Sequence, residues 1–229
     1  VHVSITDAHP RNYGNSLDYF QFRDGQFLRA DGSLIKPHAD GPLLPTESER
    51  VFNGSGTQVK RRGSESMPFS AWTSSMAIDS EGHPHIGYTL YLNNSDHRYR
   101  IASWNGEKWI DREVAYAGKC LYTRESSYTG LITLDPTDPA VVYISSDAYP
   151  MTGNDHGGRH EIYTARIDLD DDIDNIQWRA LTSDSEHRNI RPVIATGDGY
   201  KAVLWLSGPW NTFTDYYSKV VGIILETPD

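Results

Sequence analysis

Three side chains in this sequence have the chemistry for proton transfer beside a carboxylate: His9, Tyr128 and Arg191. An imidazole ionises near neutrality, so His9 can act as base or acid, although His9-Pro10 also has the composition of a simple turn. A phenol exchanges protons when a neighbouring cation pairs with the phenolate, and Arg191 is our candidate for that cation. The alternative for Tyr128 is an ordinary strand tyrosine whose hydroxyl is hydrogen-bonded within the fold.

Arg98 and Arg100 are two residues apart and therefore lie on the same face of a predicted strand. Two guanidinium groups on one face can bind a carboxylate or a sulfate bidentately. They can instead form salt bridges with acidic neighbours such as Asp96 and Glu107. Residues 60–62, one lysine and two arginines, are the strongest local attractor for a polyanion, or else a solvated loop cluster.

Two tryptophans and one histidine are further candidates for ligand contacts. Trp72 and Trp210 can stack on sugar faces, with buried packing as the alternative. His160 follows a loop and begins a predicted strand, so it can reach a ligand from that loop. A structural pairing of this segment with Asp147 or Glu161 is the other interpretation.

No metal-binding motif is complete in the sequence. The run 168–174 is rich in oxygen ligands for Ca²⁺, but it lacks the glycine and the closing glutamate of a helix-loop-helix calcium loop. His83 and His85 share a strand face without identifiable third and fourth ligands. We therefore predict no metal site and no required cofactor.

Composition excludes several classes of partner. Lys and Arg total 21 against 31 Asp and Glu in 229 residues, a formal net charge of −10. Such a chain repels duplex nucleic acid and anionic membranes at long range. No apolar run approaches the roughly 20 residues of a membrane span. The single cysteine, Cys120, cannot form a disulfide within the chain. We expect contacts with neither nucleic acid nor a bilayer core.

Alternating apolar and polar residues predict strands throughout the chain, and no segment has the periodicity of an amphipathic helix. The predicted strands include 3–6, 17–22, 85–90, 141–145, 161–165, 202–206 and 220–225. Turn dipeptides separate them, at 24–25, 31–32, 53–54, 81–82, 105–106 and 198–199. The predicted fold class is all-β.

Three segments repeat one layout of strand, tight turn and returning strand: 77–86, 132–143 and 192–203. Each is followed by a third strand, and two continue to a Trp-bearing strand, at Trp109 and Trp178. A four-stranded unit of roughly 50 residues is typical of a β-propeller blade. We predict a single β-propeller domain or subdomain over 1–229 with about four four-stranded blades. The first unit lacks its opening strand, which indicates a partial or split ring, and residues 36–66 form a long inter-blade loop.

The chain resembles a known family in several stretches. These are 115–118, 121–122 with Glu125, 128–130, 134–136, 142–145, 160–163 and 189–192, together with Tyr99, 104–106 and Trp109. They are similar to the BNR-repeat propellers of the sialidase superfamily. Within that superfamily, the chain looks most like the propellers of lyases acting on uronate-containing polysaccharides, such as ulvan lyases and rhamnose-glucuronate lyases. The resemblance implies a secreted or periplasmic protein, although the chain from Val1 carries no signal peptide.

The resemblance also implies where substrate would bind. In a propeller, first strands begin and second strands end on one face, so the residues at those ends share a funnel. We expect the funnel to contain His9, Arg11, Trp72, Asn93, Tyr128, Asp147, Arg191 and Trp210, with His160, Arg98 and Arg100 as further substrate contacts. Lyases of this type place an arginine one hairpin after the tyrosine, where this chain has Asp147. A partner for His9 would precede Val1, and an axial Ca²⁺ held by carbonyl groups would leave no motif.

Three functions are therefore open. The leading hypothesis is a lyase that cleaves an acidic, uronate-containing and optionally sulfated polysaccharide by β-elimination, with Tyr128, His9 and Arg191 as catalytic residues. The second is a non-catalytic glycan-binding propeller, or a structural half completed by the remainder of the ring or by a second chain. The third is sialidase-like glycoside hydrolysis, for which Tyr128 with Glu125 is the sole candidate pair.

Overall fold

Antiparallel strands make up nearly all the regular structure of the protein, as the alternating sequence predicts. The computed structural model describes residues 1–58, 69–168, 173–197 and 199–226. Helical structure in these ranges is confined to short 3₁₀ turns: η1 (His38–Asp40), η2 (Pro45–Glu47), η3 (Thr123–Glu125) and η4 (Ile173–Asn175). The all-β prediction is confirmed.

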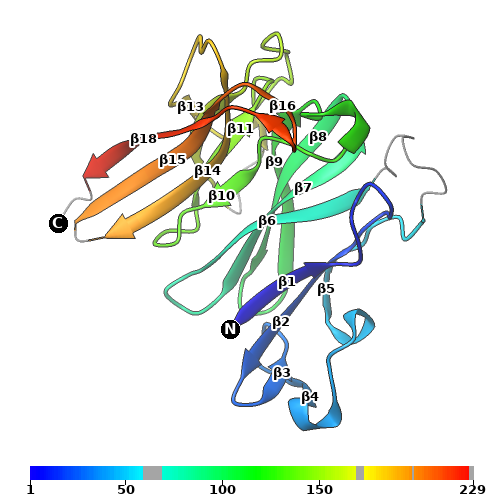
Figure 1. Ribbon diagram of the computed structural model, residues 1–229. Helices are drawn as coiled ribbons and strands as arrows, with labels where there is room; N and C mark the ends of the chain where they lie inside the picture. Colours follow the sequence, from blue (N-terminus) through cyan, green and yellow to red (C-terminus); the bar gives the residue numbers. More distant parts are fainter. Residues whose placement is uncertain (59–68, 169–172, 198, 227–229) are drawn as a thin grey trace.

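The strands form four main sheets that follow one another along the chain (Figure 1). The first contains β1 (His2–Thr6), β2 (Leu17–Arg23), β3 (Gln26–Leu28), β4 (Leu34–Pro37) and β5 (Glu49–Phe52). The second contains β6 (Ser70–Ile78), β7 (Pro84–Asn93), β8 (Asp96–Trp104) and β9 (Trp109–Gly118). The third contains β10 (Ile132–Leu134), β11 (Val141–Ser146), β12 (Glu161–Arg166) and β13 (Arg179–Ala180).

The fourth sheet has three strands, β14 (Arg188–Gly197), β15 (Tyr200–Gly208) and β18 (Lys219–Glu226). Between β15 and β18 the chain forms a separate small hairpin of β16 (Trp210–Thr212) and β17 (Asp215–Tyr216). The 200–208 strand therefore pairs with β18 instead of with the segment that directly follows it. Each repeat recognised in the sequence corresponds to a hairpin: β6 with β7, β10 with β11, and β14 with β15.

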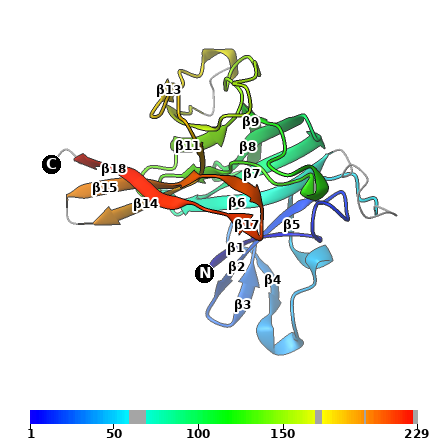
Figure 2. The ribbon, with the colours of Figure 1, turned by 45° about the horizontal axis from the view of Figure 1, so that its top comes forward.

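The first strands of successive sheets are neighbours: β1 contacts β6, β6 contacts β10, and β10 contacts β14. Hydroxyl groups join them, as in the 2.8 Å contact of Ser4 Oγ with Thr73 Oγ1 and the 2.7 Å hydrogen bond from Ser74 Oγ to Ile132 O. This succession is propeller-like, although the described sheets do not close a ring (Figure 2). The arrangement brings the starts of β6, β10 and β14 to one side of the molecule.

Apolar side chains fill the spaces between consecutive sheets. Tyr88 and Leu17 belong to the cluster between the first two sheets, Ile132 and Val114 to the cluster between the second and third, and Trp205 to that between the third and fourth. Each sheet is thus stabilised by its neighbours, since an isolated small sheet cannot bury both of its faces.

The segment 36–66, expected to be a long loop, contains regular structure that the sequence did not indicate. It includes the end of β4, the turns η1 and η2, and strand β5, which pairs with β2. Arg50 Nε on β5 donates a 2.6 Å hydrogen bond to Asp18 Oδ1 on β2, and Arg50 Nη1 also donates to Ser16 Oγ. The loop prediction is therefore wrong for residues 49–52, because a long-range ion pair, and not local alternation, places this strand.

Candidate functional site

Four of the predicted site residues lie close together in space: His9, Trp72, Tyr128 and Trp210. We call them the aromatic cluster. The ring of His9 meets that of Trp72 edge-on at 4.6 Å between centroids, and the centroids of Trp72 and Tyr128 are 5.3 Å apart. His9 and Tyr128 lie 6.1 Å apart, and Trp210 lies 6.3 Å from Tyr128 on its other side. Four segments that are distant in sequence therefore build one surface.

Strand ends position the members of the aromatic cluster. Trp72 lies near the start of β6, Tyr128 shortly before β10, Trp210 at the start of β16, and His9 in the turn after β1. The side chains of His9, Trp72 and Tyr128 are half-buried, whereas Trp210 is only 6% exposed. Trp210 therefore fits the packing interpretation, while the face of Trp72 remains partly accessible to a ligand.

The hydrogen bond at His9 identifies its proton-bearing nitrogen. The backbone N–H of Arg11 donates to His9 Nδ1 at 3.2 Å. An imidazole nitrogen that accepts a hydrogen bond carries no proton, so neutral His9 has its proton on Nε2. The Nδ1 atom of His9 is consequently engaged within the turn that contains residues 9–11.

Arg191 lies close to Tyr128 along the backbone. Its N–H donates a 2.7 Å hydrogen bond to the carbonyl of Gly130, two residues after Tyr128, and its side chain is exposed. Arg188, which the sequence did not single out, donates through Nη1 to the carbonyl oxygens of Trp210 at 3.0 Å and Leu121 at 3.3 Å. Arg188 thus fixes the backbone on which Trp210 sits, a role that becomes visible only when the loop path is known.

Three residues with left-handed backbone conformation lie at or near the starts of β6, β10 and β14, on the side of the aromatic cluster. Phe69 immediately before β6, Leu131 immediately before β10, and Arg191 within β14 have φ values of 57°, 76° and 58°. A residue with a Cβ atom in this region costs on the order of 1–3 kcal/mol, and such strain is concentrated at functional sites. Sequence patterns could not reveal these positions, because glycine, the usual residue for positive φ, occupies none of them.

Asp147 and Asn93, also predicted for the funnel, form their hydrogen bonds outside the aromatic cluster. Asp147 is buried, accepts the N–H of Lys119 at 2.9 Å, and lines a hollow of about 200 Å³ with Tyr116 and Asp155. Burial raises the pKa of the Asp147 carboxyl. Asn93 is exposed and its Oδ1 accepts the N–H of Ser95 in the β7–β8 turn.

His160 lies in the interior. It is 1% exposed, and neither ring nitrogen has a hydrogen-bond partner among the described residues. Burial, together with the charge of Arg188, lowers the pKa of His160 to about 3. A neutral, buried imidazole of this kind cannot touch a ligand without a rearrangement of the strand start around it.

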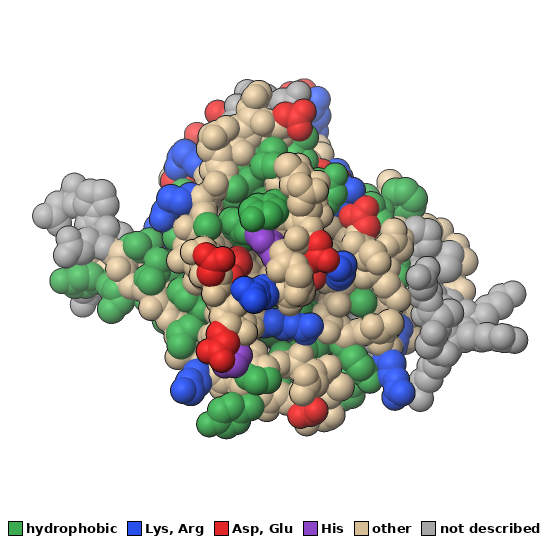
Figure 3. Space-filling model, turned by 90° about the horizontal axis from the view of Figure 1, so that it is seen from above, with side chains coloured by type: hydrophobic (Ala, Val, Ile, Leu, Met, Phe, Trp, Pro, Cys, Tyr) green, Lys and Arg blue, Asp and Glu red, His purple; other side chains and the backbone are tan. Residues whose placement is uncertain are grey.

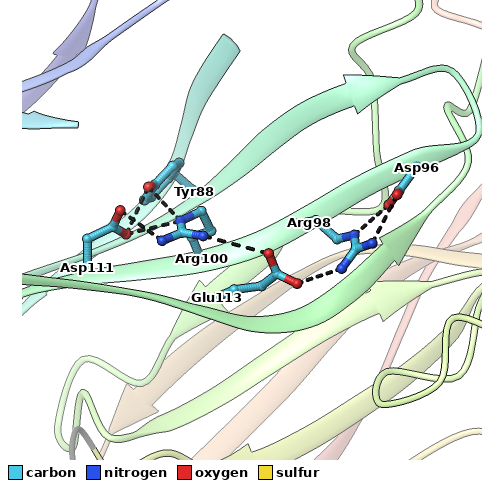
Figure 4. A network of polar contacts seen from close by, with 6 residues as sticks. All are labelled: Tyr88, Asp96, Arg98, Arg100, Asp111 and Glu113. Carbon is cyan, nitrogen blue, oxygen red and sulfur yellow. Dashed lines mark hydrogen bonds and ion pairs between the residues drawn. The ribbon is translucent and has the colours of Figure 1, made fainter. Parts of the chain in front are cut away.

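Arg98 and Arg100 belong to a network of ion pairs on β8 and β9 (Figure 4). Arg98 binds Asp96 through Nε at 2.5 Å and Glu113 through Nη1 at 2.6 Å. Arg100 Nη2 lies 3.0 Å from Asp111 Oδ2, and its Nη1 lies 3.6 Å from Glu113 Oε2. The salt-bridge interpretation is confirmed for Asp96, but the predicted partner Glu107 is wrong: Asp111 and Glu113 take its place. An anionic ligand would have to compete with these carboxylates.

The structure tests the metal and charge-cluster candidates only in part. No group of three or more His, Cys, Asp or Glu side chains in the described ranges is arranged to hold a metal ion. His85 instead contacts Ser103 Oγ through Nδ1 at 2.8 Å and Asp79 Oδ2 through Nε2 at 3.2 Å. Residues 60–62, the middle of the 168–174 run and the Glu125 side chain lie outside the described residues, and the axial Ca²⁺ stays a prediction.

Comparisons with known proteins add little to this geometry. No protein-family model matches the chain, and no curated protein matches it. A crystal structure of polysaccharide lyase Uly1 superimposes with a TM-score of 0.39 and 11% sequence identity. The match covers 98% of this chain and 43% of that one, so the chain spans less than half the length of the protein it matches. No helix among the described residues is long and apolar enough to cross a membrane.

Proposed function

We propose that the protein acts on an acidic, uronate-containing polysaccharide at the aromatic cluster and cleaves it by β-elimination. The observation that carries this proposal is the convergence of His9 and Tyr128, 6.1 Å apart between ring centroids, with Trp72 against both rings. A proton-transferring phenol, an imidazole N–H donor and an aromatic platform thereby share one surface. The resemblance of the sequence to uronate lyases agrees with this chemistry, which we place outside the cytoplasm, where such polysaccharides occur.

Each residue has a defined role in the proposed reaction. The exposed guanidinium of Arg191 neutralises the uronate carboxylate and the imidazole of His9 donates a hydrogen bond to it, which together make the hydrogen on the adjacent carbon more acidic. In the proposed step Tyr128 reacts as the phenolate: its oxygen accepts that hydrogen as a proton while the bond to the glycosidic oxygen breaks and a carbon–carbon double bond forms. The phenol O–H formed in this way then gives its proton to the departing oxygen, which restores the phenolate.

The two tryptophans have different roles: Trp72 binds substrate, and Trp210 positions Tyr128. The half-buried ring of Trp72 contacts both His9 and Tyr128 and offers its face to a sugar ring. The buried Trp210 packs with Leu121 and Ile190 behind Tyr128, and so holds the phenol in place. We therefore expect loss of Trp72 to weaken substrate binding, and loss of Trp210 to disturb the position of Tyr128.

The test is the absorbance of unsaturated uronate products while the protein acts on a panel of uronate polysaccharides. We expect Tyr128→Phe to lower the rate by roughly 100-fold or more, the usual contribution of a general acid or base. Tyr200→Phe is the matched control, because Tyr200 is an exposed tyrosine at the far end of β15. A Tyr128→Phe variant with an unchanged rate would contradict the assignment.

A second candidate function is glycan binding without cleavage. One observation favours it: β11, the second strand after Tyr128, leads to Asp147, which is a buried carboxyl. The lyases that the chain resembles have a cation at this place. In this case an acidic oligosaccharide binds the aromatic cluster and is released without cleavage. Binding that Trp72→Ala abolishes, with no rise in absorbance for any substrate, would favour this function over the lyase.

A further inference from the structure

A second hollow, of about 390 Å³, lies away from the aromatic cluster, between the loop that follows β11 and the segment that follows β13. We call it the Tyr149 hollow. Among the residues that line it are Tyr149, His156, Arg159, Glu161, Tyr163 and Asp184. Its volume falls within the roughly 300–1,000 Å³ typical of small-molecule sites.

Aromatic rings in contact form one wall of the Tyr149 hollow. The centroids of Tyr149 and His156 are 3.9 Å apart, and the hydroxyl of Tyr163 lies 2.5 Å from His156 Nε2. Burial, reinforced by the charge of Glu161, raises the pKa of Tyr163, so its hydroxyl remains protonated in this hydrogen bond. The His156 ring is therefore fixed from beneath, and it supports Tyr149, whose side chain is 52% exposed.

A buried carboxylate, that of Glu161, fixes the 182–185 turn that lines another part of the hollow. Glu161 is 4% exposed and accepts hydrogen bonds from Thr182 Oγ1 at 2.5 Å and from Ser185 N and Oγ at 2.8 and 2.7 Å. These bonds tie the 182–185 turn to β12. Within the turn, Asp184 has a φ of 51°, a strained conformation that the surrounding bonds maintain.

Two charged side chains at the Tyr149 hollow have no hydrogen bond or ion pair with any described residue: Arg159 and Asp184, both exposed. Arg159 offers a fork of N–H donors, and Asp184 offers carboxylate acceptors. An exposed aromatic ring that shares a hollow with a donor and an acceptor matches a sugar ring, which presents C–H groups on its face and hydroxyl groups at its edge.

The charge of the lining selects among sugars. Three carboxylates line the hollow, those of Asp155, Glu161 and Asp184. Lys119 pairs with Asp155, so two carboxylates remain against the single guanidinium of Arg159. Figure 3 shows the face above β11 and β13, where acidic, basic and histidine side chains are interspersed and positive charge does not dominate. An anionic ligand would be repelled by the surplus of carboxylates.

We infer that the Tyr149 hollow binds a neutral, hydroxyl-rich sugar residue, stacked on Tyr149 and hydrogen-bonded by Arg159 and Asp184. This site goes beyond the proposed lyase reaction, because it uses none of the residues of the aromatic cluster. It equips the protein to hold a neutral residue of a polysaccharide whether or not cleavage takes place at Tyr128.

Saturation-transfer difference NMR with methyl glycosides tests the inference. The probes are methyl β-D-glucopyranoside, methyl β-D-xylopyranoside and methyl α-L-rhamnopyranoside, with methyl β-D-glucuronide as the charged comparison. We expect at least one neutral glycoside to give a signal that falls roughly tenfold in Tyr149→Ala and in Arg159→Ala, the loss of one good aromatic or polar contact. Tyr149→Phe preserves the ring and should retain the signal, which also guards against a folding defect in the alanine variant.

Two controls separate this site from others. Tyr216→Ala removes an exposed tyrosine on β17 and should leave the signal unchanged, as should Tyr128→Phe in the aromatic cluster. The inference is overturned if no neutral glycoside gives a signal, if the signal that Tyr149→Ala removes is larger for the glucuronide than for the neutral glycosides, or if the neutral-glycoside signal survives Tyr149→Ala. Loss of the signal in Tyr128→Phe would also overturn it, by placing the sugar at the aromatic cluster. Failure of lyase activity alone leaves this result unaffected.

Discussion

Replacing Lys201 with methionine should remove the ion pair that joins the third and fourth sheets. Lys201, near the start of β15, donates a hydrogen bond through Nζ to Oδ2 of Asp135, which directly follows β10. Asp135 is fully buried, and its Oδ1 accepts the N–H and the hydroxyl of Thr137 at 2.9 and 2.8 Å. Burial alone would raise the pKa of Asp135, but the hydrogen bonds from Lys201 and Thr137 outweigh it and lower that pKa.

The magnitude follows from what the variant leaves behind. Removing one partner of a buried ion pair costs about 3–5 kcal/mol, because the other charge stays buried without compensation. Asp135 keeps its two bonds from Thr137, and 15% of the Lys201 side chain is exposed, so we expect the lower end of that range, about 3 kcal/mol. For a chain of this length this corresponds to a fall in Tm of about 6–12 °C.

Urea unfolding followed by tryptophan fluorescence measures this loss, with Asp135→Asn/Lys201→Met as the comparison. The double variant removes both charges and should recover more than half of the lost free energy of unfolding. In the wild type, the lowered pKa of Asp135 gives a stabilisation that is complete above the unfolded value near 3.9 and disappears as pH falls through the folded value.

In Lys201→Met the carboxyl loses its cation, so its pKa rises and it takes up a proton at higher pH than in the wild type. The difference in stability between the two proteins should therefore be largest at pH 7 and should shrink toward pH 4. A loss below about 1 kcal/mol, typical of a surface pair, or a double variant as unstable as the single one would refute the reasoning.

Three further changes test other parts of the structure. Glu113→Gln removes the carboxylate shared by two arginines and should cost about 1 kcal/mol in urea unfolding, with the loss shrinking in 1 M NaCl; Glu107→Gln in the adjacent turn is the control and should be neutral. Burial lowers the pKa of His97 to about 4 and that of His160 to about 3. As pH falls, these histidines therefore take up protons in the unfolded state before they do so in the folded state. Their contribution to the free energy of unfolding should be complete above pH 6.5 and should fall by about 1.4 kcal/mol per pH unit for each histidine as pH decreases toward 4.5. A His160→Gln variant whose pH slope matches that of the wild type would contradict this. Arg191→Gly relieves a left-handed backbone and should preserve stability or raise it by up to about 1 kcal/mol while abolishing turnover; a clear drop in Tm would show that the side chain has a structural role.

Local alternation sufficed to predict most of the strands. Residues 85–90, 161–165 and 202–206 all fall within observed strands. Burial alternates along 202–206, whereas residues 86–90 and 161–165 are buried on both faces of their sheets. The convergence of His9, Trp72 and Tyr128 also followed from the sequence, since the polarity of successive hairpins assigns their ends to a common side.

Features set by long-range geometry escaped prediction. The irregular register between β8 and β9 places Arg100 opposite Glu113, whereas Glu107 lies in the turn that connects the two strands. The Tyr149 hollow depends on a loop that folds back so that His156 N bonds to Asp147 O at 2.8 Å. Neither the register shift nor this loop path has a local signature in residue types.

The four main sheets are contiguous in sequence, spanning residues 2–52, 70–118, 132–180 and 188–226, and this bears on how the chain folds. Most pairings close within one such span, so each sheet can form from local contacts before it associates with the next. Opening should follow the same divisions, with amide hydrogen exchange reporting one cooperative unit per sheet. The β14–β15–β18 unit exposes Val193 and Ile224 on one face and has a described neighbour only on its other side, so we expect it to exchange first.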